Sequence, residues 1–233
     1  MRRHKFQCVD CIIDVVTRLE DLVNEVVFVG GAVSGLLITD PAVPSMRPTL
    51  DVDVIIEVTT QQEYYRFQER LRKKGFNVAM DETIICRFRN GPIILDVMPA
   101  DESILGFTNK WYAGCVQHAK IMTLDDVQFR VVTPEYFLAT KLEAFLGRGN
   151  LDYAVSHDME DIIAVIDGRV EIIQEVIDAD EDVRAYLIAQ FSDLIADDDF
   201  MDALPGHLRP DSASQQRLPI LIKRIEQLAG KSS

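Results

Sequence analysis

The spacing of apolar residues changes near residue 132, and the change restricts the architectures open to this chain. Before it, short apolar runs such as VVFV (26–29) and PIILDVM (92–98) lie between glycine turns and helical stretches, as in a sheet flanked by helices. After it, TPEYFLATKLEAFLGR (133–148) begins a series of segments with helical spacing. The sequence therefore predicts an α+β fold: a mixed β-sheet core over residues 1–132, followed by a C-terminal helical domain over residues 133–233.

Several local signals predict the elements within these two parts. Residues 9–25 have helical spacing, Asn90-Gly91 is a hairpin turn signal between two strands, and a second short hairpin is expected around Asp125-Asp126. Thr133 is a plausible N-cap of the first helix of the second part. The acidic, proline-containing stretch 196–214 is expected to be a solvated connection. Further helices are expected near 156–167, 169–178, 181–196 and 214–229.

The composition permits a sizeable core and disfavours two classes of protein. Of the 233 residues, 48% are hydrophobic, and the formal net charge is −14. A surface that coats nucleic acid needs clustered Lys and Arg, so this charge argues against general nucleic-acid binding but leaves room for a small basic site. No apolar run approaches the roughly 20 residues that a membrane span needs, and Asp10 and Asp14 interrupt the apolar segment after the basic start. We therefore expect a cytoplasmic protein without a membrane segment.

Two carboxylates stand at the start of an otherwise apolar strand, in RPTLDVDVIIEV (47–58). Two residues apart on a strand, Asp51 and Asp53 point to the same face, where they repel each other. A strand end in contact with solvent would tolerate them without any partner. A bound Mg²⁺ would instead remove the repulsion, because this ion prefers hard oxygen ligands.

Two further features favour the metal. FVGGAVSG (28–35) places paired glycines between a strand and a helix, where backbone amides can approach a phosphate, although a tight turn explains the glycines equally well. PIILDVMP (92–99) carries Asp96 in another apolar strand, and an adjacent strand would bring it beside Asp51 and Asp53. Three carboxylates at neighbouring strands suit a site with two metal ions for phosphoryl transfer.

The helical half contributes a second set of charged residues. Lys141 and Arg148 lie on one face of a predicted helix, opposite Leu138, Leu142 and Phe145, and could hold phosphates. Salt bridges to Glu143 or Asp152 on a solvated face are the simpler interpretation. Asp158 and Asp161 follow one turn apart, with Ser156 as a possible N-cap, and acids at a helix start are favoured by the helix dipole alone.

Taken in order, these residues resemble the DNA polymerase β-type nucleotidyltransferase superfamily. The pattern GG…RPTLDVDV…ILDV is similar to its glycine turn, paired acids and third acid. KLEAFLGRGNLDYAVSHDMEDI (141–162) resembles the Lys-x-x-Ala-x-x-x-Arg…Asp-x-x-Asp block of AbiEii-like proteins, a family of bacterial toxin nucleotidyltransferases that includes the MenA-type enzymes. The resemblance covers roughly residues 26 to 167.

The resemblance implies a role for each residue of the pattern. Asp51, Asp53 and Asp96 would ligate Mg²⁺, with two ions expected, and Asp96 would help to deprotonate the acceptor hydroxyl. Lys141 would hold nucleotide phosphate with support from Arg148, and either Asp158 or Asp161 would orient it. The residues implied to contact the triphosphate at the glycine turn are Gly30, Gly31 and Ser34; Gly31 stands where the superfamily often has a serine.

The function implied is transfer of a nucleoside monophosphate from an NTP to an acceptor hydroxyl, with release of pyrophosphate. The acceptor could be RNA such as a tRNA end, a protein side chain or a small molecule, and a toxin would have a cognate antitoxin. Two alternatives come from other classes of protein: a non-catalytic nucleotide sensor on the same fold, and an interaction protein in which every acid is superficial.

Overall fold

The computed structural model describes residues 3–43, 49, 51–78, 85–106, 108–148 and 152–231. Within it the chain forms two compact units. The sheet unit contains residues 1–35 and 45–133, and the helical unit contains residues 36–44 and 134–233. Residues 44–48, part of the proline-rich stretch DPAVPSMRP (40–48), lie outside the described residues.

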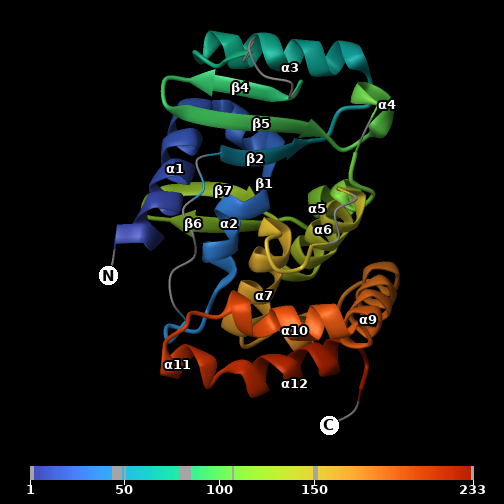
Figure 1. Ribbon diagram of the computed structural model, residues 1–233. Coiled ribbons are helices and arrows are strands. Elements are labelled where there is room, and N and C mark those ends of the chain that lie inside the picture. Colours follow the sequence, from blue (N-terminus) through green and yellow to red (C-terminus); the bar gives the residue numbers. More distant parts are fainter. Residues whose placement is uncertain are drawn as a thin grey trace. The chain divides into compact units, whose positions relative to one another are not determined.

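The sheet unit is built on a mixed sheet of seven strands in the order β3-β4-β5-β2-β1-β7-β6 (Figure 1). Apart from the aspartates of β2 and β5, the central strands β1, β2 and β5 are apolar and mostly buried, which agrees with their position between neighbours on both sides. β2 runs parallel to β5 and antiparallel to β1, and β1 runs parallel to β7. The strands are β1 (Val26–Val29), β2 (Asp51–Ile56), β3 (Asn77–Val78), β4 (Arg87–Asn90), β5 (Ile93–Pro99), β6 (Lys120–Leu124) and β7 (Val127–Val131).

Both expected hairpins are confirmed. β4 and β5 pair antiparallel across Asn90 and Gly91, and Gly91 has the positive φ of 62° that such a turn requires. β6 and β7 pair antiparallel across Asp125, which has a φ of 50°. The first of these hairpins matters for the site, because it fixes which residue of β4 faces which residue of β5.

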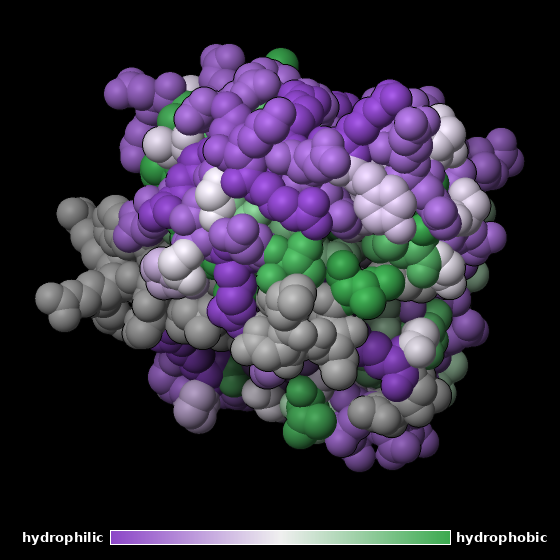
Figure 2. Space-filling model, turned by 90° about the horizontal axis from the view of Figure 1, so that it is seen from above, coloured by the Kyte–Doolittle hydropathy of each residue, from purple (hydrophilic) through white to green (hydrophobic). Residues whose placement is uncertain are grey.

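Helices pack on this sheet through apolar faces. The expected first helix is observed as α1, which contacts β2, β5 and β7, followed by a short 3₁₀ helix. Thr60 and Glu63 form a capping box that starts α3, whose exposed face is charged. Figure 2 shows the molecule from the side of α3, where hydrophilic residues cover a large area and a smaller hydrophobic area lies beside them. The helical segments of the sheet unit are α1 (Arg3–Leu19), η1 (Glu20–Glu25), α2 (Gly30–Leu37, whose last two residues belong to the helical unit), α3 (Gln61–Lys73), α4 (Glu102–Leu105) and α5 (Tyr112–His118).

The helical unit packs around α6, whose buried residues include Phe137, Leu138, Leu142 and Phe145. α6 contacts α7, α8 and α9, and α12 packs on the same three helices (Figure 1). Thr133 was expected to cap α6, but its hydroxyl is buried and, within the described residues, has no hydrogen-bond partner. The helices are α6 (Pro134–Gly147), α7 (His157–Gly168), α8 (Ile172–Ile177), α9 (Glu181–Ile195), α10 (Asp198–His207), α11 (Ser212–Gln215) and α12 (Leu218–Leu228).

The expectation of a solvated connection over 196–214 was wrong in its first half. This stretch contains α10, in which Asp197 is the N-cap and its carboxylate accepts hydrogen bonds from the amides of Asp199 and Phe200. Phe200 and Leu204, four residues apart, bury one face of the helix. Pro205 lies inside this helix, where it cannot donate a backbone hydrogen bond, and the helix ends two residues later at His207.

The segment Leu36–Pro44 packs with the helical unit, although it lies between two parts of the sheet unit in the sequence. The amides of Thr39 and Asp40 both donate to the carbonyl of Gly168 at the C-terminus of α7. Arg217 donates to the carboxylates of Asp40 and Asp167, which joins the segment to α7. Across the described stretches of both units, none of the helices has the length and hydrophobicity needed to cross a membrane.

Candidate functional site

Sheet register brings the three aspartates of the sheet unit together. In the parallel pair of β2 and β5, Asp53 is the register partner of Asp96, so their side chains leave the same face of the sheet from neighbouring strands. Asp51 lies two residues before Asp53 and shares that face. The expected convergence of these acids is therefore observed, while their role as metal ligands stays a prediction.

The glycine turn lies directly against Asp53. Val29, the last residue of β1, is the register partner of Asp53, and Gly30 begins α2 with a φ of 71°. A Cβ atom added to Gly30 would lie 2.7 Å from Cγ of Asp53, which is an overlap. Glycine is thus needed at this position for two reasons: it tolerates the left-handed backbone, and it leaves room for the carboxylate of Asp53.

Arg87 is a site residue that the sequence did not reveal. It is the register partner of Asp96 in the antiparallel pair of β4 and β5. Its Nε and Nη2 donate to the two carboxylate oxygens of Asp96 at 2.8 and 2.7 Å, and Nη2 also reaches Oδ2 of Asp51 at 3.3 Å. A guanidinium therefore lies between two of the three acids.

Two further side chains, Thr49 and Cys86, lie near these acids. The Thr49 hydroxyl donates to Oδ1 of Asp51, so each oxygen of that carboxylate has a hydrogen-bond partner. Burial and the nearby negative charge of Asp96 raise the pKa of Cys86 to about 12, which leaves Cys86 a neutral thiol at physiological pH and unsuited to act as a nucleophile. The polar chemistry of this face thus rests on carboxylates and guanidinium.

The donor chemistry of the three aspartates fits a divalent cation, because carboxylate oxygens are the ligands that Mg²⁺ prefers. Their present arrangement is not a closed cage of carboxylates, since Arg87 lies between Asp51 and Asp96. Consistent with this, no group of three or more His, Cys, Asp or Glu side chains has the arrangement of a metal site in the part of the chain that the structure describes. The fit is therefore one of donor chemistry, and the role of the three aspartates as metal ligands stays a prediction.

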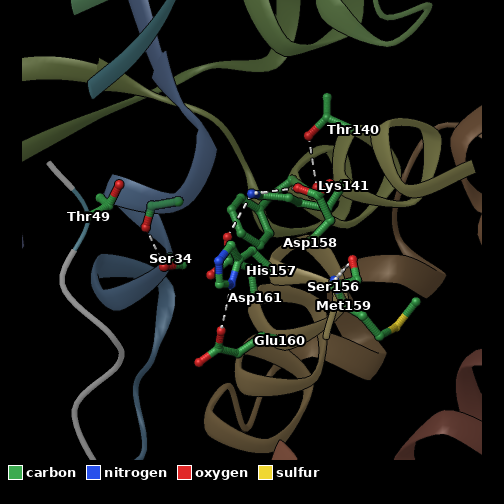
Figure 3. Close-up of polar contacts among 12 residues, drawn as sticks. Ser34, Thr49, Thr140, Lys141, Ser156, His157, Asp158, Met159, Glu160 and Asp161 are labelled. Carbon is green, nitrogen blue, oxygen red and sulfur yellow. Dashed lines mark hydrogen bonds and ion pairs between the residues drawn. The ribbon is translucent and has the colours of Figure 1, made fainter. Parts of the chain in front are cut away.

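Ser34 and Gly31 lie in the first turns of α2. Ser34 is 1% exposed, and its hydroxyl donates to the carbonyl of Gly31 at 2.6 Å (Figure 3). The hydroxyl is therefore used within the helix. Phosphate binding by Ser34 stays a prediction, and the amides of Gly30 and Gly31 are better placed for that role because they begin the helix.

A second charged cluster, in the helical unit, consists of Lys141 from α6 and of Asp158 and Asp161 from α7. Nζ of Lys141 lies 3.1 Å from Oδ1 of Asp158 and 2.6 Å from Oδ2 of Asp161 (Figure 3). The side chains of the two acids are 4% and 1% exposed, and that of Lys141 is 12% exposed. These acids are thus buried partners of a lysine and not merely acids at a helix start.

Arg148 extends this cluster to the surface. Its Nη1 contacts Oδ2 of Asp158 at 3.0 Å, and its side chain is 68% exposed. The partners of Lys141 and Arg148 in these ion pairs are therefore the acids of α7, in place of the Glu143 and Asp152 that a solvated face suggested. Ser156 caps α7 as expected, because its side chain accepts from the amide of Met159.

Two of the solved structures that this chain resembles have nucleotidyltransferase in their names. An antigenic nucleotidyltransferase-like protein from Paracoccidioides brasiliensis matches with 20% identity and a TM-score of 0.49, over 86% of this chain and 93% of that one. An H. pylori protein provisionally assigned as a nucleotidyltransferase matches with 10% identity and a TM-score of 0.47, over 99% of this chain and 96% of that one. No family model matches the chain, and no curated protein matches it significantly.

Proposed function

We propose that this protein is a metal-dependent nucleotidyltransferase, which moves a nucleoside monophosphate from an NTP to an acceptor hydroxyl. The observation that supports this most strongly is the contact of three elements on one face of the sheet: Asp53 of β2 beside Asp96 of β5 and against Gly30 at the start of α2. Such an arrangement suits a reaction in which carboxylates and helix-start amides meet a triphosphate.

The residues of the sheet unit would bind and orient the reactants. The amides of Gly30 and Gly31 would bind phosphate oxygens, and Asp51 and Asp53 would hold Mg²⁺, which neutralises charge on the triphosphate when bound. The acceptor oxygen would form a bond to the α-phosphorus while the bond from that phosphorus to the oxygen of the β-phosphate breaks. Pyrophosphate leaves with the bonding electrons, and the hydroxyl proton passes to a carboxylate or to water.

Lys141 would bind nucleotide phosphate, with Arg148 in support. A lysine is suited to this because its ammonium group is a compact charge on a flexible stem. Asp158 and Asp161 both contact Nζ of Lys141, so both would orient it. For the acceptor we propose a hydroxyl of RNA, of a protein or of a small molecule, and a toxin with a cognate antitoxin is the biological setting that the family resemblance supports.

A transfer assay tests this proposal. The protein is incubated with Mg²⁺ and each of four NTPs labelled at the α-phosphate, together with cell extract as a source of acceptors. We expect one NTP to label an extract component and Asp53→Asn to lower this transfer by about 10²–10³-fold while the protein stays folded. Glu57→Gln, an exposed position just after the same strand, is the matched control and should keep full activity.

Arg87 favours a second candidate, a nucleotide sensor without turnover. Because the guanidinium already neutralises Asp96, these acids are stable together without catalysis. Calorimetry separates the two functions: Mg²⁺-dependent NTP binding without pyrophosphate release supports the sensor. If neither nucleotide nor metal binds, both proposals are wrong.

A further inference from the structure

The strand β6 is an open edge of the sheet. It is the last strand in the sheet order, and within the described residues it pairs with β7 alone (Figure 1). We infer that two copies of this chain associate at β6, by antiparallel pairing of one β6 with the other. The inference does not depend on the proposed function, because β6 contains none of the residues to which that function is assigned.

β6 lacks most of the features that protect an edge strand from pairing. Edges are usually protected by proline, by a bulge, by inward-pointing charge or by being very short. β6 has five residues, KIMTL, in uninterrupted register with β7, and its one charged residue is Lys120 at its start. The next residue, Ile121, is 73% exposed. The strand at the other edge of the sheet, β3, has only two residues, so β6 offers the longer ladder to a partner strand.

The turn after β6 determines which backbone groups face the free edge. Leu124 and Val127 flank a two-residue turn, so they form a hydrogen-bonded pair, and the two kinds of pair alternate from there along the hairpin. Thr123 and Gln128 then form a non-hydrogen-bonded pair, in agreement with the contact of their side chains, 3.3 Å between Oγ1 and Nε2. Thr123 and Ile121 consequently direct their N–H and C=O groups away from β7, toward a further strand.

These outward backbone groups match those of a second copy in one antiparallel register. When Met122 lies opposite Met122 of the second copy, Ile121 of each copy faces Thr123 of the other, and each of these pairs exchanges two hydrogen bonds. The two Ile121 side chains are then diagonal neighbours and cover each other on the exposed face. The same arrangement therefore satisfies both copies, as a two-fold axis requires.

The charges at the two ends of β6 complement each other in this register. Lys120 of one copy faces Leu124 of the other, which directly precedes the turn acids Asp125 and Asp126. All three charged side chains are exposed. Within one chain, Lys120 and the turn acids lie at opposite ends of the strand, so this attraction arises only between copies. The match between the two ends of one strand favours a second copy over a strand of another protein.

The dimer is expected to be weak. Stable protein complexes bury about 1,200–2,000 Å² of surface, and pairing along five residues covers less than that. The net charge of −14 also makes two copies repel each other at a distance. The chain should therefore be monomeric when dilute and dimeric when concentrated.

Sedimentation velocity of the full chain at rising protein concentration tests the inference. We expect the wild type to shift from monomer to dimer. Ile121→Pro should stay monomeric, because it removes an outward N–H and leaves the hydrogen bonds to β7 in place. Ile121→Lys should also stay monomeric, because like charges then meet across the axis, and it covers the case in which the proline variant folds poorly. The control is Ile85→Lys, at an isoleucine of the sheet unit that is 56% exposed and outside β6; it should dimerise as the wild type does.

A charge exchange between copies separates pairing in this register from a change within one chain. Lys120→Glu and Asp126→Lys should each weaken the dimer about tenfold when measured alone, because like charges then meet at both ends of the paired strands. An equimolar mixture of the two variants should dimerise as strongly as the wild type, because each end then joins one acid and one base. Circular dichroism of each variant shows that the fold is retained.

Three outcomes would overturn the inference. The first is a wild-type chain that stays monomeric up to its solubility limit. The second is a dimer that Ile121→Pro and Ile121→Lys leave unchanged, because the copies then meet elsewhere. The third is a loss in both charge variants without recovery in their mixture, which would contradict the register with Met122 on the axis.

Discussion

The sheet unit and the helical unit each bury carboxylates beside a basic residue, but they do so in different ways. In the sheet unit, strand register places Asp96 opposite Arg87, and a planar guanidinium satisfies both oxygens of one acid. In the helical unit, Asp158 and Asp161 lie one turn apart on α7, and the ammonium of Lys141 contacts both of them. Arg87 therefore forms a fork with one carboxylate and a single longer contact with Asp51, at 3.3 Å, whereas the ammonium of Lys141 is shared between two carboxylates without a fork.

This difference indicates different uses for the two clusters. A guanidinium fork fixes direction and is costly to displace, so it suits a residue that holds another in place. An ammonium group is a point charge without such geometry, and it can turn toward an incoming phosphate while its acids stay where they are. We therefore expect the Arg87 cluster to be rigid and the Lys141 cluster to respond to nucleotide.

The largest effect on stability is expected from Lys141→Met. This change removes the ammonium that Asp158 and Asp161 share, at 3% and 1% exposure, and leaves Asp158 with its contact to Arg148. Breaking a buried ion pair by removing one partner costs about 3–5 kcal/mol of unfolding free energy. Urea denaturation followed by circular dichroism measures this loss.

Two controls show whether burial of the two acids causes the loss. Lys223→Met changes an exposed lysine of α12 and should alter the unfolding free energy by less than about 0.5 kcal/mol. Lys141→Met/Asp158→Asn/Asp161→Asn should recover most of the stability. If Lys141→Met is as stable as the wild type, the two acids are not held by the lysine, and the comparison between the clusters fails.

A smaller effect is expected from Gly30→Ala, which probes the sheet unit. The new Cβ would overlap the carboxylate of Asp53, and the backbone at φ 71° is strained for alanine, at about 1–3 kcal/mol. Displacement of Asp53 should also weaken Mn²⁺ binding, measured by electron paramagnetic resonance.

Variants at two other glycines distinguish the effect of backbone strain from the effect of overlap with Asp53. Gly91→Ala has a similar φ of 62° with open space around the position, so it should cost backbone strain and leave Mn²⁺ binding unchanged. Gly35→Ala, in α2, meets nothing within 4 Å and should stabilise the protein by about 0.5–1 kcal/mol. Equal Mn²⁺ binding by Gly30→Ala and Gly91→Ala would show that the contact with Asp53 is unimportant for the metal.

The smallest effect is expected from pH and concerns the helical unit. Burial lowers the pKa of His207, whose Nε2 donates to the carbonyl of Tyr153 with Glu160 nearby. The unfolded chain therefore binds a proton at higher pH than the folded protein does, so stability falls as pH drops below about 6.5. The melting temperature measured from pH 7.5 to 5.5 should decrease less in His207→Gln than in wild type, and as much as in wild type in His157→Gln, an exposed histidine.

Much of the sheet unit could be predicted because its signals are local. Asn90-Gly91 specifies a hairpin by turn chemistry, and the spacing of Asp51 and Asp53 puts both on one face whatever surrounds them. Asp96 could be expected beside them only on the assumption that its strand is adjacent. The family resemblance added the roles of these residues, which spacing alone does not supply.

Arg87 was not expected at the site, because its partner is decided by strand register and not by its own residue type. Arg87 and Arg89 alternate along β4 with Phe88, a pattern that also describes a solvated strand face. A shift of one residue in the pairing would have moved both arginines to the other face. The turn at Asn90-Gly91 carried the missing information, since counting back from it places Arg87 opposite Asp96.

Long-range packing explains two other differences between the sequence predictions and the structure. The stretch 196–214 has the acids and the proline of a loop, yet Asp197 caps a helix because Phe200 and Leu204 find a core to pack on. Likewise, no local signal in the sequence around Asp40 predicts its ion pair with Arg217, which is 177 positions away in the chain.

The allocation of Leu36–Pro44 to the helical unit makes that unit discontinuous in the gene. The chain passes from one unit to the other three times, after residues 35, 44 and 133. A fragment that begins at Pro134 lacks the backbone amides that occupy the Gly168 carbonyl and the acid that shares Arg217 with Asp167. A single truncation or a single recombination breakpoint therefore cannot separate the complete helical unit from the sheet unit. The two units must be inherited together.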